Sequence, residues 1–116
     1  MGYGVESETN EGLNIVAGAV REAYLTVDAA ATVSPGQVYQ YNDTENNYDD
    51  FTAGATALRY AVCNEAAKTI SADTQVRCII AGPVQKDHLD ATSKADADID
   101  VALGKCGIFA EPNAIV

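Results

Sequence analysis

Four side chains of this sequence have the types that nucleophilic or metal chemistry requires: the thiols of Cys63, Cys78 and Cys106 and the imidazole of His88, the single histidine. A cysteine and a histidine that meet can act as nucleophile and general base. No motif in the sequence places a thiol beside His88. Free cysteine usually behaves as a small buried hydrophobe, and Cys78 and Cys106 both stand at apolar positions of their segments. We therefore expect core thiols, no catalytic residues and no enzymatic activity.

The cysteines also lack the spacing of metal ligands. Zinc sites normally contain one closely spaced ligand pair, such as Cys-x-x-Cys, and the sequence has no such pair. An odd number of widely spaced cysteines is typical of free thiols in a reducing cytosol rather than of a disulfide framework. The sequence therefore predicts three reduced cysteines, no bound metal and no cofactor.

Carboxylates gather in residues 42–50, which include Asp43, Glu45, Asp49 and Asp50. Several carboxylate oxygens in one loop are what Ca²⁺ requires, but the spacing does not match an EF-hand and its sixth-position glycine is missing. We interpret the segment as an acidic surface loop. The whole chain is acidic too, with 7 Lys and Arg against 17 Asp and Glu and a net charge of -10. This charge argues against nucleic acid or an anionic membrane as a partner.

The elements that must position these side chains are mainly strands. Alternating apolar and polar residues predict strands over 20–27, 37–41, 58–63 and 75–84, with a further short strand over 108–110. Ser34-Pro35-Gly36 between the first two predicts a type II turn, and Gly82-Pro83 predicts a bulge or an edge in the fourth. Tyr is the main aromatic residue, with six Tyr, two Phe and no Trp.

One helix is expected near the C-terminus. Ser93 and Asp96 have the spacing of a capping box, and Gly107 suits the position after the C-cap. The apolar face of this helix would be Ala95, Ile99, Ala102, Leu103 and Cys106. The predicted fold class is mainly β, a β-rich α+β fold: a small compact β-barrel-like or β-tulip domain with one short helix near the C-terminus and a flexible N-terminal arm.

A chain of 116 residues suffices for one domain. Residues 1–14 hold three Gly and three Glu with little to bury, so we expect a flexible arm followed by a single β-rich domain over 15–116. The polar N-terminus does not resemble a signal peptide, and no apolar run approaches the ~20 residues of a membrane span.

The order of these elements resembles the lambda-type bacteriophage head decoration proteins, over about residues 15–113. The resemblance rests on Val27-Asp28-Ala29-Ala30-Ala31-Thr32-Val33-Ser34-Pro35-Gly36-Gln37-Val38-Tyr39, Ala53-Gly54-Ala55-Thr56-Ala57-Leu58-Arg59-Tyr60-Ala61-Val62, Gln75-Val76-Arg77-Cys78-Ile79-Ile80-Ala81-Gly82-Pro83-Val84, Asp87-His88-Leu89 and Gly107-Ile108-Phe109. These segments are similar to that family's early hairpin, apolar strand, closing strand, short turn and final strand.

The resemblance implies a structural virion protein, made in the host bacterial cytoplasm, that decorates and stabilises the outer surface of an expanded phage capsid. It implies homotrimers at local threefold positions, with the major capsid protein as partner. It also implies an arm that orders on the shell by adding a strand. The candidate capsid-binding residues are Gly12, Leu13, Asn14, Ile15 and Val16, the apolar end of the arm.

Two other classes of function remain open at this point. One is a small β-rich ligand-binding or carrier domain without catalytic activity. The other is a metal- or cysteine-dependent enzyme, which elemental analysis of the purified protein would detect.

Overall fold

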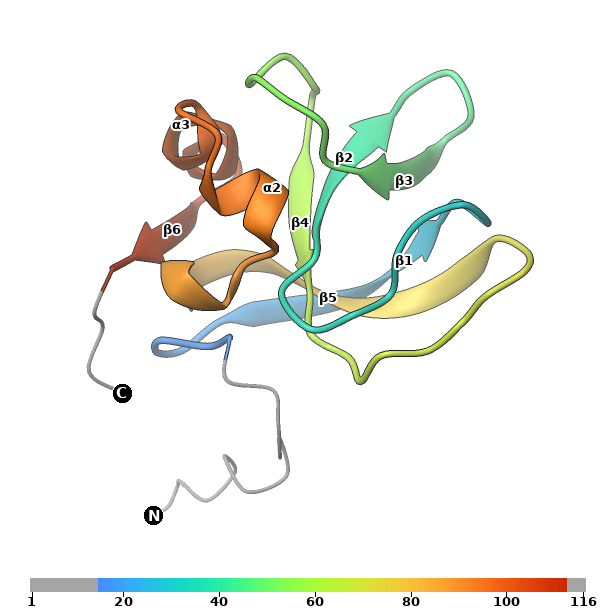
Figure 1. The fold of residues 1–116 in the computed structure, drawn as a ribbon, viewed down its shortest axis with the longest axis horizontal. Helices are drawn as coiled ribbons and strands as arrows, with labels where there is room; N and C mark the ends of the chain where they lie inside the picture. The colour runs from blue at the N-terminus through green and yellow to red at the C-terminus, as the bar shows by residue number, and fades with distance from the viewer. Residues whose placement is uncertain (1–14, 113–116) are drawn as a thin grey trace.

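The computed structural model describes residues 15–112, which form a mixed sheet of six strands with three short helical segments. The strands are β1 (Arg21–Val27), β2 (Val38–Asn42), β3 (Asn47–Asp50), β4 (Tyr60–Cys63), β5 (Thr74–Gln85) and β6 (Ile108–Glu111). The helical segments are the 3-10 helix η1 (Lys86–His88) and the α-helices α2 (Ala91–Lys94) and α3 (Ile99–Gly104). In Figure 1 the helices and β6 lie together at one end of β5. The expected mainly β, barrel-like fold is confirmed.

Five of the strands close into a ring. The sheet order is β1-β3-β2-β4-β5-β6, and β1 also pairs with β5, so that β1, β3, β2, β4 and β5 form a small barrel. The closing contact between β1 and β3 is one parallel pair, Val27 with Tyr48, supported by a 2.9 Å bond from the Asp28 N–H to the Tyr48 carbonyl. A closed ring leaves few strand edges for unwanted pairing.

The strand β5 changes partners along its 12 residues. Its first part lies between β1 and β4, and its last four residues pair with β6 in parallel. Gly82 is the first residue of β5 that pairs with β6. Its φ is 108°, and a Cβ at this position would lie 2.6 Å from the Ala19 carbonyl oxygen. Only glycine tolerates that position, which accounts for the irregularity expected at Gly82-Pro83.

The molecule has two cores, one on each face of β4, because side chains alternate between the faces of a strand. The barrel core is Val27, Val33, Tyr39, Tyr48, Ala61, Cys63, Val76 and Cys78. The helix-side core is Ile15, Val38, Phe51, Tyr60, Val62, Ile79, Val84, Leu89, Ile99, Ala102, Leu103 and Ile108. All four residues of β4 are buried, since each side chain enters one core or the other.

The turn predicted at Ser34-Pro35-Gly36 has the expected geometry. The Gln37 N–H donates to the Ser34 carbonyl over 3.0 Å, and Gly36 has φ of 88°. A Cβ at Gly36 would lie 2.0 Å from the His88 carbonyl oxygen, so the turn is also packed against η1.

Residues 42–50 are not a continuous loop, and this expectation was wrong. β2 extends to Asn42, the turn is confined to 43–46, and β3 pairs with β2 through four residue pairs. The buried Asn47 side chain donates to Asp28 and to Asp73 over 3.2 Å each, and Tyr48 enters the barrel core. Tertiary pairing therefore overrides the low strand propensity of a polar segment.

The single helix predicted near the C-terminus is two helices, and Ser93 is not its N-cap. Asp90 caps α2 by accepting from the Ser93 N–H over 3.0 Å. The Asp98 N–H then donates to the Asp96 carboxylate over 2.8 Å, a local bond that competes with helix continuation. Of the five expected apolar positions, Ile99, Ala102 and Leu103 are buried, whereas Ala95 is exposed and Cys106 is half-buried.

Candidate functional site

The barrel is open at one end, where inward-facing positions continue beyond the buried barrel core. Tyr41 stands two residues after Tyr39 on β2, and Ile80 stands two residues after Cys78 on β5. A two-residue step returns a side chain to the same face of a strand. Leu25 on β1 precedes Val27 in the same way, and both Leu25 and Tyr41 pack against the barrel core.

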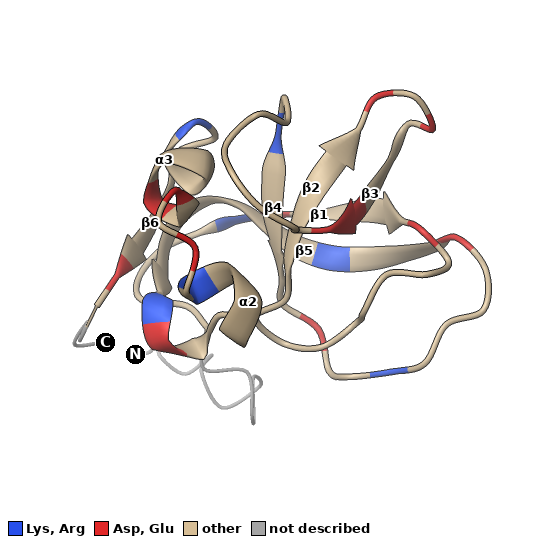
Figure 2. Cartoon of the chain, turned by 45° about the horizontal axis from the view of Figure 1, so that its top comes forward, with Lys and Arg blue, Asp and Glu red and all other residues tan. Residues whose placement is uncertain are grey.

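These residues line a depression of about 560 Å³, which we call the barrel mouth. Its lining is Leu25, Tyr41, Tyr48, Leu58, Arg59, Tyr60, Ile80, Lys105 and Cys106. Every strand of the ring contributes to it, together with residues that flank β4 and follow α3. Figure 2 shows basic positions at the start of β4 and just after α3, on the same side of the molecule as the acidic β2–β3 turn.

Two tyrosine rings are in contact in the mouth, and a guanidinium lies over one of them. The rings of Tyr41 and Tyr48 meet edge to face with centroids 5.2 Å apart. The Arg59 guanidinium lies 4.0 Å from the centroid of the Tyr41 ring, which is cation–π geometry. Burial raises the pKa of the Tyr48 phenol, and the neighbouring Arg59 opposes that rise. The phenol is therefore a neutral hydrogen-bond donor at neutral pH.

The second cation of the mouth is Lys105, which follows α3. Its ammonium donates to the carbonyls of Ala55 and Ala57 over 2.8 and 2.9 Å and lies 5.9 Å from the Tyr60 ring centroid. The neighbouring Cys106 sulfur accepts from the Tyr60 N–H over 3.2 Å. Lys105 thus fastens the 55–57 segment to the end of α3 and brings positive charge to the rim.

The predicted capsid-binding residues fall in two places. Gly12, Leu13 and Asn14 lie outside the described residues, as does the rest of the arm. Ile15 is 2 % exposed and belongs to the helix-side core, and Val16 is half-buried and bridges Val84. The Gln85 N–H donates to the Ile15 carbonyl over 2.6 Å. This segment is thus docked on its own domain, alongside the last part of β5.

The four side chains considered first for chemistry are not gathered into a site. Cys63 and Cys78 are paired positions of β4 and β5, fully buried in the barrel core, and burial raises the pKa of both thiols. His88 is exposed at the end of η1, and all three cysteines are free. Within residues 15–112, no three His, Cys, Asp or Glu side chains are grouped as metal ligands.

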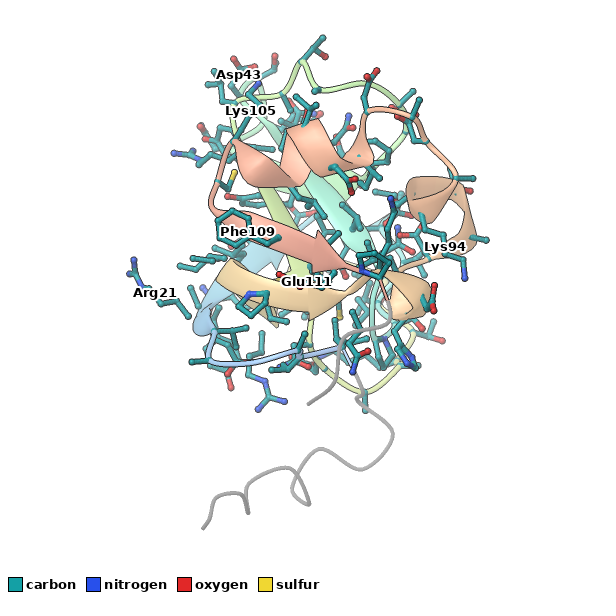
Figure 3. The ribbon with its side chains drawn as sticks, turned by 90° about the vertical axis from the view of Figure 1, so that its left-hand side faces the viewer. Arg21, Asp43, Lys94, Lys105, Phe109 and Glu111 are labelled. Carbon is teal, nitrogen blue, oxygen red and sulfur yellow. The ribbon has the colours of Figure 1, made fainter. Side chains whose placement is uncertain are left out.

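Two large apolar side chains are exposed at the helical end of the molecule. Val101 of α3 and Phe109 of β6 are 61 % and 56 % exposed. Phe109 pairs with Pro83 of β5, and among the described residues the other edge of β6 has no strand partner. Figure 3 looks onto this side, where Phe109 lies on β6 between the labelled Arg21 and Lys105.

The sequence did not reveal the mouth. Its tyrosines stood out as the main aromatic residues, but Arg59 and Lys105 lie 46 positions apart and no motif links them. The signal that could have found Arg59 is its alternation with Ala61 and Cys63, which continues the inward face of β4.

Comparison with models of protein families, with curated proteins and with solved structures gives no match. None of the helices in the described part of the chain has the length and apolar character needed to cross a bilayer.

Proposed function

We propose that this protein is a structural virion component that decorates and stabilises the outer surface of an expanded bacteriophage capsid, as homotrimers at local threefold positions. Its partners are the major capsid protein and other copies of itself. The proposal comes from the resemblance of residues 15–113 to the lambda-type head decoration proteins. A small, acidic, β-rich domain is compatible with a place on the outside of a shell, away from packaged DNA.

The observation that supports it best is the arrangement around the last part of β5. Residues 15–17 run along one side of this strand, where the Ala17 N–H donates to the Pro83 carbonyl over 3.1 Å. On the other side lies β6, with its exposed Phe109. The arm therefore joins the domain on the side of β5 opposite to β6. The edge of β6 that has no strand partner among the described residues is where an added strand would satisfy backbone groups and cover apolar surface.

Deletion of residues 1–14 tests the role of the arm. Three glycines and three glutamates cannot offset the ~1–2 kcal/mol per residue lost on fixing the backbone, so the domain does not need them to fold. The truncated protein, which keeps Ile15, should retain its circular dichroism, thermal transition and oligomeric state. It should lose most of its affinity for expanded, undecorated capsids in a sedimentation assay.

The control is the full chain with Glu6, Glu8 and Glu11 changed to Gln, which keeps the length of the arm. Retained binding by this variant would assign the contact to the backbone and apolar residues rather than to charge. Truncated protein that binds capsids as tightly as the full chain would contradict the docking role. Light scattering of the full chain should give a trimer of roughly 36 kDa, as closed cyclic assembly of 12.1 kDa subunits requires.

A second candidate function is a small ligand-binding domain without catalytic activity. The barrel mouth favours it, because mouths of small barrels are common ligand sites and the volume of about 560 Å³ lies within their usual range.

A further inference from the structure

We propose that the barrel mouth binds an organic anion: a molecule with a flat apolar body and one carboxylate or sulfonate group. The proposal rests on the second candidate function and is independent of capsid decoration. The shape, the lining and the charge of the mouth each contribute to the argument.

The floor of the mouth is apolar and aromatic. Leu25 and Ile80 reach it from β1 and β5, and the Tyr41 and Tyr48 rings stand edge to face beside them. Aromatic pairs of this kind present both a ring face and a ring edge to a third ring. A flat apolar body is therefore the shape that covers most of this floor.

The rim is cationic, and the described residues bring no carboxylate to it. None of the residues within 15–112 that line the mouth is acidic, although the chain has 17 Asp and Glu. All seven Lys and Arg lie within the described residues, and three of them, Lys68, Arg77 and Lys86, form ion pairs with carboxylates. Of the four without a carboxylate partner there, Arg59 and Lys105 both line the mouth.

Arg59 is held in a position to bind an anion. Its guanidinium carbon lies 4.0 Å from the centroid of the Tyr41 ring, and this contact restricts the conformations of an otherwise exposed side chain. A planar guanidinium can donate two parallel hydrogen bonds to a carboxylate or sulfonate. Because the net charge of the protein is negative, the protein as a whole repels anions. Arg59 and Lys105 provide local attraction for an anion at the mouth.

The test is titration of the full chain with 1-anilinonaphthalene-8-sulfonate, a flat aromatic sulfonate whose fluorescence rises in apolar surroundings. We expect saturable binding to the folded protein, with circular dichroism unchanged. Arg59→Gln should weaken it about 10-fold, the effect of one lost charge-assisted hydrogen bond, and Arg59→Lys should fall between. Lys94→Gln is the matched control, because Lys94 also lacks a carboxylate partner within residues 15–112 but does not line the mouth.

A neutral probe of the same shape, N-phenyl-1-naphthylamine, tests the anionic group separately. It should bind more weakly than the sulfonate and should not respond to Arg59→Gln. Absence of sulfonate binding, or equal affinity in the native protein and the Arg59→Gln variant, would overturn the proposal. Equal binding of the two probes would overturn the preference for an anion. None of these outcomes bears on capsid sedimentation, so failure here is distinguishable from failure of the decoration proposal.

Discussion

The two parts of β5 serve two cores of different construction. Its first part, up to Ala81, lies between β1 and β4, where Val76 and Cys78 face the barrel core and Ile79 faces the helix-side core. The neighbours of this part come from distant parts of the chain. Its last part, Gly82 to Gln85, pairs with β6 and packs in the helix-side core. Half of the buried residues of the helix-side core come from the contiguous residues 82–111.

This difference shows how one long strand connects two structural units in a small domain. The half of the helix-side core that lies in residues 82–111 comes from one stretch of chain, whose loops close at less entropic cost than those of long-range contacts. The barrel depends on pairing over long sequence separations, including the single pair that joins β1 to β3. Because the same strand runs through both, we expect them to unfold in one cooperative transition.

The largest expected effect comes from Leu103→Ala in α3. Leu103 is fully buried in the helix-side core, and truncation of such a side chain costs about 2–5 kcal/mol of unfolding free energy. Val101→Ala on the exposed side of the same helix should change it by less than about 0.5 kcal/mol. Urea unfolding, followed by both fluorescence and circular dichroism, measures the unfolding free energy of the two variants. Two separate transitions in Leu103→Ala would show that the units are not coupled through β5.

Alkaline pH should weaken the barrel core specifically. Burial raises the pKa of Cys63, Cys78 and Tyr39, so the folded state keeps protons that the unfolded state releases. Stability is therefore complete below pH ~8 and falls as pH rises above about 9, by at most roughly 1.4 kcal/mol per pH unit for each thiol.

Urea midpoints at pH 7.5, 9 and 10 test this expectation. Cys78→Ser removes one ionisable thiol and should make the decline shallower, even though the variant starts from a lower stability. A decline in Cys78→Ser as steep as in the native protein would show that groups outside the barrel core set the alkaline limit.

Asp90 joins the two units, so its removal should have an intermediate effect. Its carboxylate accepts from the Ser93 N–H at the start of α2 and from the Val38 N–H at the start of β2, over 3.0 and 2.9 Å. Asp90→Ala should cost about 1–2 kcal/mol. Asp98→Ala is the matched control, because Asp98 holds the N-cap position of α3 without a side-chain cap bond. Equal melting temperatures for Asp90→Ala and Asp98→Ala would contradict the expectation that Asp90 joins the two units.

The smallest effect is on thiol accessibility and leaves the fold unchanged. Cys106 is half-buried at the barrel mouth, whereas Cys63 and Cys78 are fully enclosed in the barrel core. Iodoacetamide should alkylate Cys106 first, and mass spectrometry of digests should find the other two modified only on the timescale of unfolding. Equal rates for all three thiols would show that the barrel opens locally.

Local patterns predicted much of the fold, and the misses have physical causes. Alternation placed β1, β2, β4 and β5 within a few residues, and Ser34-Pro35-Gly36 formed the expected turn because Gly36 tolerates a positive φ. β3 was missed because its sequence Asn-Tyr-Asp-Asp carries no strand signal of its own. It is a strand because β2 pairs with it and because Asp28 and Asp73 bind the Asn47 amide.

The sequence alone determined which segments extend, where the chain turns, and that the protein is acidic, since these follow from side-chain period, backbone restriction at Pro and Gly, and composition. Only the tertiary structure decided that the strands close into a ring, that Ile15 docks on its own core, and that Arg59 and Lys105 both line the mouth. Each of these joins residues far apart in the chain. Such contacts depend on pairing register and on the packing of both cores, and no local pattern encodes them.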